Sequence, residues 1–228
     1  MPVLEVETPN SGPSTLAVER IVNCGYTGRD EAAVQAHIDE LAAEGVPAPD
    51  DFPTFYPKPH HLLATPGQIK VVGDRTSGEA EFVLIPTTEE TYVGVGSDHT
   101  DRDLERTEVL ASKLVCQSVV GETLWPLSAV QDHWDELALR SWVVEDETRT
   151  KYQETTLDAI CPPSDLLSMV EERVRVPLAG TAVFSGSVAT ETEELRPASR
   201  FEAELYDPEL DRQLTCEYDV SVADWLTR

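Results

Sequence analysis

Acidic side chains at short spacing are the feature of this sequence that points most directly to chemistry. Glu79 and Glu81 lie two apart in the run GEAEFVLI, and Asp98 follows in the segment GVGSDHTDRDLE. Side chains two residues apart on a strand point to the same face, and a neighbouring strand can bring a third beside them. Three carboxylates suit Mg²⁺, Mn²⁺ or Ca²⁺ better than zinc. The spacing therefore predicts a divalent-metal site, although an acid-rich chain also contains such pairs by chance.

A histidine and a glutamate form a second candidate group, on a helix that we predict from about Glu31 to Glu44. Asp30 is a suitable N-cap for this helix, and Gly45 a suitable end. Glu40 follows His37 by three residues, so their side chains are close enough for a hydrogen bond. An imidazole titrates near neutral pH, as a general base requires. The alternative is an ordinary histidine on a helix surface.

The order of these motifs resembles the fumarylacetoacetate hydrolase superfamily. In that family a Glu-x-Glu strand precedes a strand that ends in Asp-x-(Ser/Thr)-x-Arg-Asp, and the two Glu and the first Asp hold a divalent ion. The matching positions here are Glu79, Glu81 and Asp98. The family's opening strand and helix carry a His-x-x-Glu pair, which His37 and Glu40 match. The resemblance therefore implies a metal triad and a catalytic base in one chain.

The resemblance extends to residues that would contact substrate. Lys58, in FYPKP, matches a position that faces the substrate in relatives, and Lys113 lies where the family has a second active-site lysine. Arg102 is a further candidate for binding a substrate carboxylate, because its guanidinium forms paired hydrogen bonds. One loop and one further position differ from the family. The Thr-Gly-Thr-Pro loop appears as Ser-Gly-Ser-Val, which keeps a hydroxyl at Ser187, and Glu105 replaces a common Gln.

The resemblance implies a divalent-metal-dependent hydrolase that cleaves a carbon–carbon bond in an acylpyruvate or a related 2-oxo or 1,3-dicarbonyl acid. Mg²⁺ or Mn²⁺, with Ca²⁺ as a further candidate, would stabilise the enolate that forms. His37, Glu40 and Lys113 would be catalytic, and Lys58, Arg102 and Ser187 would bind substrate. One alternative is a decarboxylase, hydratase or isomerase of 2-oxo acids on the same site. Another is a non-catalytic module that binds a metal or a small molecule.

The composition limits the partners of the protein. A net charge of -26 argues against nucleic acid and anionic membranes, because both are bound through lysine and arginine. Only four lysines occur against thirteen arginines, and this acid-rich, lysine-poor composition indicates a salt-adapted organism. The partner we expect is a small 2-oxo or dicarbonyl acid. The family resemblance also implies a homodimer.

The four cysteines are widely scattered, without the paired spacing of a zinc site. The N-terminal MPVLEVETPNSG has acidic residues and no long apolar stretch, so we expect neither a signal peptide nor a membrane span. A cytoplasmic protein with free thiols is the expected result. A length of 228 residues fits a single domain over 1–228, with 1–15 as an N-terminal extension or edge strand.

The pattern of apolar residues predicts an α+β chain dominated by sheet. Strands are expected over 16–24, 79–86 and 91–96, and the last third alternates as antiparallel strands do. A single helix is expected from Arg102 to Leu114, and the proline-rich segment from Pro47 to Pro59 reads as an extended connection without regular structure. These elements agree with the mixed β-roll or sandwich, with a few short helices, that the fumarylacetoacetase-like resemblance implies.

Overall fold

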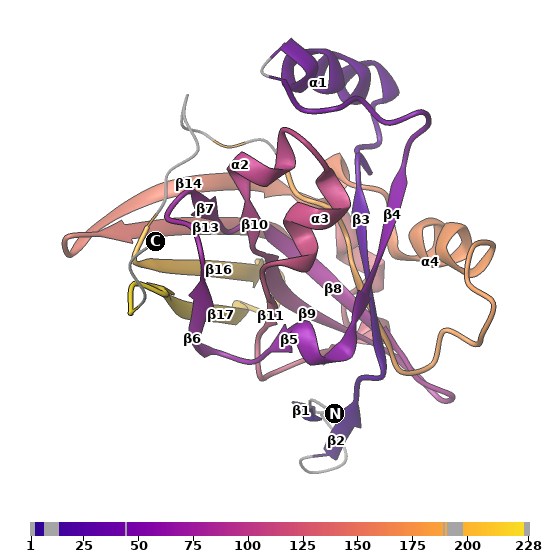
Figure 1. Ribbon diagram of the computed structural model, residues 1–228. Helices are drawn as coiled ribbons and strands as arrows, with labels where there is room; N and C mark the ends of the chain where they lie inside the picture. The colour runs from indigo at the N-terminus through magenta and orange to yellow at the C-terminus, as the bar shows by residue number, and fades with distance from the viewer. Residues whose placement is uncertain (1–2, 7–13, 44, 189, 191–197, 226–228) are drawn as a thin grey trace.

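Two mixed β-sheets form the framework of the structure, a computed structural model that describes residues 3–6, 14–43, 45–188, 190 and 198–225 (Figure 1). The larger sheet has eight strands. Seven of them follow one another across the sheet in the order β4 (Thr54–Pro59), β3 (Arg20–Gly25), β15 (Thr181–Phe184), β8 (Ala80–Pro86), β9 (Thr91–Asp98), β11 (Ser118–Val120) and β5 (Leu63–Ala64). The eighth, β12 (Trp125–Pro126), also pairs with β9.

The smaller sheet has five strands, in the order β14 (Thr148–Thr156), β13 (Ala138–Glu145), β16 (Arg200–Asp207), β17 (Arg212–Val222) and β6 (Gly67–Val71). Most neighbouring strands in the two sheets are antiparallel, but β15 with β3, β11 with β5 and β17 with β6 are parallel. Two short pairs complete the strands: β1 (Val3–Val6) with β2 (Ser14–Ala17), and β7 (Thr76–Ser77) with β10 (Thr100–Asp101). The predicted α+β, sheet-dominated roll is confirmed.

Strand β8 is buried on both faces, which explains its uninterrupted apolar run. Phe82 and Leu84 pack into the core between the two sheets. Val83 and Ile85 point the other way, into a second core on the opposite face of the large sheet. A strand covered on both sides has no solvent-facing positions, so it does not alternate between apolar and polar residues.

The large sheet curls around this second core. Strands β3 and β11 are separated by β15, β8 and β9, yet Asn23 Nδ2 on β3 donates a hydrogen bond to Ser118 Oγ on β11, 3.3 Å away. Lys58 on β4 likewise reaches Asp98 on β9, with 3.3 Å between Nζ and Oδ1. The curl therefore brings polar side chains from strands far apart in the sheet to one end of its inner face.

The helices are α1 (Glu31–Ala43), α2 (Arg102–Glu105), α3 (Val109–Leu114) and α4 (Pro163–Glu171), with 3₁₀ turns η1 (His60–Leu62), η2 (Leu127–Ala129), η3 (Gln131–Glu136) and η4 (Leu157–Ala159). In Figure 1, α1 lies at the top of the molecule, above α2 and α3, and the β1–β2 pair lies at the opposite end. Residue 44, where the predicted helix ended, lies outside the described residues. No helix in the described part of the chain has the length and apolar character that crossing a membrane requires.

Two sequence predictions about local structure were wrong. The helix expected from Arg102 to Leu114 is split into α2 and α3, because Glu108 has an extended backbone and its carboxylate caps α3 by accepting from the Leu110 N–H, 3.0 Å away. The proline-rich connection ends in a strand, β4, which pairs only with β3 at the edge of the sheet. Pro57 and Pro59 are tolerated there because an edge strand needs hydrogen bonds on one side only.

The strand predicted over 16–24 is two strands, β2 and β3, with Val18 and Glu19 between them. Leu4, on β1, is buried in the second core. Part of the proposed N-terminal extension, residues 1–2 and 7–13, lies outside the described residues.

Candidate metal centre and active site

Glu79, Glu81 and Asp98 converge at the end of the β8–β9 hairpin. Glu81 lies on β8 opposite Gly96 of β9, and the Asp98 N–H donates to the Glu79 carbonyl at 3.1 Å. One carboxylate oxygen from each residue lies within 4.8 Å of the other two. The strand periodicity and the tight hairpin thus place the three carboxylates together, as the sequence analysis expected.

Asp98 is wholly buried, and both of its oxygens have cationic partners. Oδ1 accepts hydrogen bonds from Lys58 Nζ at 3.3 Å and from Ser118 Oγ at 3.1 Å, while Oδ2 accepts from Lys113 Nζ at 2.5 Å. Burial opposes ionisation, but the charges of Lys113 and Lys58 outweigh it and hold the pKa of Asp98 well below its usual range. Asp98 is therefore a fixed, ionised carboxylate.

Glu81 is equally buried but less well compensated. Its Oε2 accepts a hydrogen bond from the Gly186 N–H at 2.8 Å, and it forms no ion pair with a described residue. Burial, and then the negative charge of Asp98, raise the pKa of Glu81 well above its usual value. A buried carboxylate in this position is stabilised by a nearby cation. The three oxygen donors thus fit a hard divalent ion such as Mg²⁺, Mn²⁺ or Ca²⁺.

The backbone at Gly186 explains why the C-terminal loop has glycine there. Its φ of +87° is strained for other residues, and a Cβ would lie 2.7 Å from Thr27 Oγ1. The Thr27 hydroxyl also donates to the Ser185 carbonyl at 2.5 Å. These contacts fix the Ser-Gly-Ser segment against the segment that follows β3, with the Gly186 N–H directed at Glu81.

Arg102 connects Glu79 of the triad to a further acidic side chain, Glu105. Its Nη2 lies 2.9 Å from Glu79 Oε1, at an angle outside hydrogen-bond geometry, and its Nη1 donates to Glu105 Oε2 at 2.9 Å. Its Nε donates to Ser77 Oγ at 2.8 Å. Burial alone would lower the pKa of Arg102, but Glu79 and Glu105 outweigh it and raise the value further. The guanidinium is therefore a structural counter-ion for this end of the site.

A cavity of about 500 Å³ opens beside these residues. It is bordered by α1, by the segment after β3, by α3 and by the end of β14. Five of the nine residues predicted for the site line it: His37, Glu79, Glu81, Lys113 and Ser187. The cavity is large enough for a small organic acid.

Four predicted site residues are not on the cavity wall. Asp98 lies behind it, and the side chains of Lys58 and Arg102, 1% and 9% exposed, point at carboxylates of the cluster. We expected Lys58 and Arg102 to contact the substrate, but neither of them lines the cavity. Glu40 also lies off the wall, on the exposed side of α1.

His37 and Glu40 are close but not hydrogen-bonded in this conformation. His37 Nδ1 lies 3.8 Å from Glu40 Oε2, which is too long for a hydrogen bond. The two side chains are 47% and 78% exposed. The imidazole therefore borders the cavity while remaining accessible to water.

His99 supports the triad from the other side of the sheet. Its Nδ1 lies 3.0 Å from the Tyr218 hydroxyl and its Nε2 lies 2.9 Å from Thr76 Oγ1. The Tyr218 hydroxyl lies 2.8 Å from Ser97 Oγ, which in turn accepts from the Glu79 N–H at 3.0 Å. Burial, followed by the charge of Arg102, lowers the pKa of His99 to about 3, so the ring is neutral. This network anchors the backbone of Glu79.

Sequence reasoning missed three residues of the site. Asn23 and Ser118 are buried and belong to the hydrogen-bonded group around Asp98. Tyr26 lines the cavity with a φ of 59°, an uncommon backbone conformation for a tyrosine, and burial raises its pKa to about 12. Asn23 could have been noticed, since it interrupts the apolar strand IVNC. Nothing in the sequence indicates that Ser118 lies opposite it.

Solved structures share this fold. The protein Cg1458 matches with a TM-score of 0.67 and 14% identity, over 96% of this chain and 88% of that one. A yeast fumarylacetoacetate hydrolase family protein, ynq8, has a TM-score of 0.64 and 16% identity, over 90% and 94%. A 2-keto-3-deoxy-D-arabinonate dehydratase complexed with magnesium and 2,5-dioxopentanoate has a TM-score of 0.63 and 13% identity, over 90% and 74%. The architecture is that of fumarylacetoacetate hydrolase family proteins.

Residues 24–218 match the model of a protein family of unknown function, DUF2848. The chain belongs to this family. A search of curated proteins finds no match. The predicted fumarylacetoacetase-like fold and the predicted placement in a family of unknown function are confirmed.

Proposed function

We propose that this protein is a divalent-metal-dependent enzyme that acts on a 2-oxo acid, and that it hydrolyses a carbon–carbon bond in an acylpyruvate or a related 1,3-dicarbonyl acid. The observation that carries the proposal is the convergence of Glu79, Glu81 and Asp98 within 4.8 Å, next to a cavity that His37 also lines. The magnesium-bound dehydratase with the same fold supports this class of ligand.

Glu79, Glu81 and Asp98 would hold Mg²⁺ or Mn²⁺, which supplies Lewis-acid stabilisation of an enolate when bound. Lys58 and Ser118 orient Asp98 by hydrogen bonds to Oδ1. They therefore act on the substrate only through this carboxylate, because neither lines the cavity.

Lys113 is the cation of the cluster that reaches the cavity wall. Its Nζ lies 3.8 Å from Glu79 Oε2, and the surrounding carboxylates outweigh burial and raise the pKa of its ammonium. Lys113 therefore stays protonated and supplies positive charge to a developing oxyanion.

His37 accepts a proton from a water molecule that attacks the distal carbonyl carbon of the substrate. Its exposure to water and its place on the cavity wall suit this role. Glu40, 3.8 Å away, orients the ring and stabilises the imidazolium when the pair closes on a ligand. Ser187 also lines the cavity and can donate a hydrogen bond to a ligand there.

Dehydration of a 2-oxo acid is the second candidate reaction, and the dehydratase among the structural neighbours favours it. It would use the same triad. The two reactions differ in the bond that breaks, carbon–carbon or carbon–oxygen, so product analysis separates them.

The test is a screen of acylpyruvates and 2-oxo-3-deoxy acids with Mg²⁺ or Mn²⁺, with the products identified by mass spectrometry. We expect acylpyruvate to give pyruvate and a second carboxylic acid. His37→Asn should reduce this turnover by about 100-fold or more, as loss of a general base does. His61→Asn, at an exposed histidine away from the cavity, is the control. Turnover that is equal in the two variants would contradict the assigned base.

A further inference from the structure

The positive groups on the cavity wall already have acidic or carbonyl partners. Among the described lining residues, Arg29 and Lys113 are the only lysine or arginine. Lys113 Nζ contacts Asp98 Oδ2 at 2.5 Å. Arg29 donates from Nη1 to Asp135 Oδ2 at 3.0 Å and from Nε to the Ile160 carbonyl at 2.6 Å. Neither offers an uncommitted cation to a substrate.

The two other cations near the triad do not reach the wall. Lys58 is held by Asp98 and Ser118, and Arg102 lies between Glu79 and Glu105. The expected role of these two residues, binding a substrate carboxylate, would require Lys58 to leave the buried Asp98, and Arg102 to leave the partly buried Glu79 or Glu105. Removing a charge from a buried pair is costly.

Glu105 changes the charge balance of the site. Its side chain is 16% exposed, lines the cavity and shares Arg102 with Glu79. The cluster thus has four carboxylates (Glu79, Glu81, Asp98 and Glu105) against three cations (Lys58, Lys113 and Arg102). With a bound divalent ion, the cluster would carry one net positive charge, which a single carboxylate on the substrate balances.

The remaining acidic residues of the wall reinforce this balance. Asp30, Glu154 and Asp158 also line the cavity. Asp30 accepts hydrogen bonds from the first turn of α1, and Glu154 pairs with Arg140, but Asp158 forms no ion pair with a described residue. A second anionic group on a substrate would face carboxylates here.

We propose that the site selects a 2-oxo acid with one carboxylate, whose distal part is uncharged or positively charged, and that Glu105 determines this selectivity by repelling a second carboxylate. The inference rests on the proposed function, since the first carboxylate and the 2-oxo group are those that bind beside the triad. The inference adds to the proposed function the charge of the distal part of the substrate.

The test measures the binding of three oxamates by calorimetry, in the presence of Mg²⁺. Each has the same chelating head but a different tail: N-isobutyl oxamate is neutral, N-oxalylglycine carries a carboxylate, and N-(2-aminoethyl)oxamate carries an amine. We expect N-oxalylglycine to bind about tenfold more weakly than either of the others, because its second carboxylate meets a like charge at Glu105, which is only 16% exposed. Oxalate, measured in parallel, reports on the chelating head alone.

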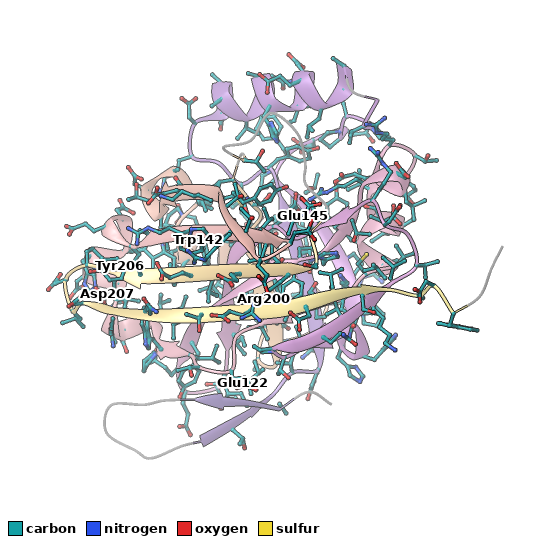
Figure 2. The ribbon with its side chains drawn as sticks, turned by 90° about the vertical axis from the view of Figure 1, so that its left-hand side faces the viewer. Glu122, Trp142, Glu145, Arg200, Tyr206 and Asp207 are labelled. Atoms are coloured by element: carbon teal, nitrogen blue, oxygen red, sulfur yellow. The ribbon has the colours of Figure 1, made fainter. Side chains whose placement is uncertain are left out.

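The variant Glu105→Gln keeps a hydrogen-bonding partner for Arg102 and removes the charge. It should reduce the discrimination between N-isobutyl oxamate and N-oxalylglycine by about fivefold or more. Glu122→Gln, at an exposed position away from the cavity (Figure 2), should leave it unchanged. Two results would overturn this inference alone, provided that oxalate binds with the metal. One is a preference for N-oxalylglycine over N-isobutyl oxamate. The other is a discrimination in Glu105→Gln that equals that of the unchanged protein. Failure of oxalate to bind with metal would overturn the proposed function and the inference together.

Discussion

Carboxylates paired with arginine or lysine occur in two different environments in this protein. At the candidate site they are buried: the side chains of Lys58 and Asp98 are 1% and 0% exposed. On the outer face of the five-stranded sheet they lie in water: Arg200 and Glu217 are 39% and 46% exposed. Figure 2 shows this outer face, with Trp142 on β13 and both Arg200 and Tyr206 on the neighbouring β16.

The buried and the exposed pairs contain the same residue types but differ in how much they contribute to stability. Exposed pairs contribute about 0–1 kcal/mol each, because water and salt screen them. In a buried group each charge depends on its partners, and removing one costs about 3–5 kcal/mol. The exposed pairs therefore add little to stability, whereas the buried group holds Asp98 in a position that depends on its two lysine partners.

Replacing Lys58 with Met should give the largest effect. It leaves Asp98 buried with one lysine instead of two, so the free energy of unfolding should fall by about 3–5 kcal/mol. Denaturant unfolding in high-salt buffer measures this change. The control is Lys70→Met, at an exposed position on β6, which should change it by less than about 0.5 kcal/mol. A similar loss in both variants would remove the contrast between buried and exposed charges.

Replacing Glu79 with Gln should weaken Mg²⁺ or Mn²⁺ binding by about 100-fold or more, which exceeds the usual cost of losing an outer-shell partner. The reason is that a neutral amide replaces one of three carboxylate ligands. Calorimetric titration with the metal alone measures the effect. Glu89→Gln, at the exposed turn of the same hairpin, serves as the matched variant and should bind normally. Equal affinities would remove Glu79 from the metal site.

Removing the Tyr218 hydroxyl tests the difference between interior and surface polar groups without changing any charge. Tyr218→Phe leaves His99 and Ser97 short of a partner in the interior, so stability should fall by about 1–3 kcal/mol. Tyr206→Phe removes a hydroxyl that contacts Asp211 at the surface and should change stability much less. Thermal unfolding of both variants tests this difference, and an equal loss in the two variants would contradict it.

The smallest effect is expected on the outer face of the five-stranded sheet. Arg200→Ala removes solvent-exposed contacts to Glu217 and Asp219, and Glu202, its less exposed partner, keeps Arg149, so the change should alter stability by about 1 kcal/mol or less. The effect should shrink further as salt is added, because screening weakens exposed pairs. Unfolding measured at low and high salt checks both points. A salt-independent loss of several kcal/mol would show that this face is not simply solvated.

The sequence predicts the part of the site that depends on local geometry. Glu79 and Glu81 share a face because a strand has a period of two, and Asp98 is adjacent because β8 and β9 form a hairpin. The predicted helix over 31–44 also agrees closely with α1, Glu31–Ala43, because capping residues mark its ends. These features involve residues near one another in the chain.

The sequence does not predict the contacts that the curl of the large sheet creates. Lys58 reaches Asp98 and Asn23 reaches Ser118 across several strands, and no local pattern encodes these distances. Lys58 and Arg102 were accordingly expected at the substrate, although burial commits them to carboxylates. The homodimer and the single-domain boundary over 1–228 stay predictions.

The central claim is that Glu79, Glu81 and Asp98 form a metal site for a 2-oxo acid. The most direct test is calorimetric titration of the protein with Mg²⁺ or Mn²⁺ in high-salt buffer, with and without oxalate as a mimic of the enolate, repeated for Glu81→Gln. We expect one metal ion per chain and oxalate that binds only when the metal is present and strengthens metal binding. In Glu81→Gln, both metal binding and oxalate binding should be lost. Absence of metal binding, or equal affinity in Glu81→Gln, would contradict the central claim.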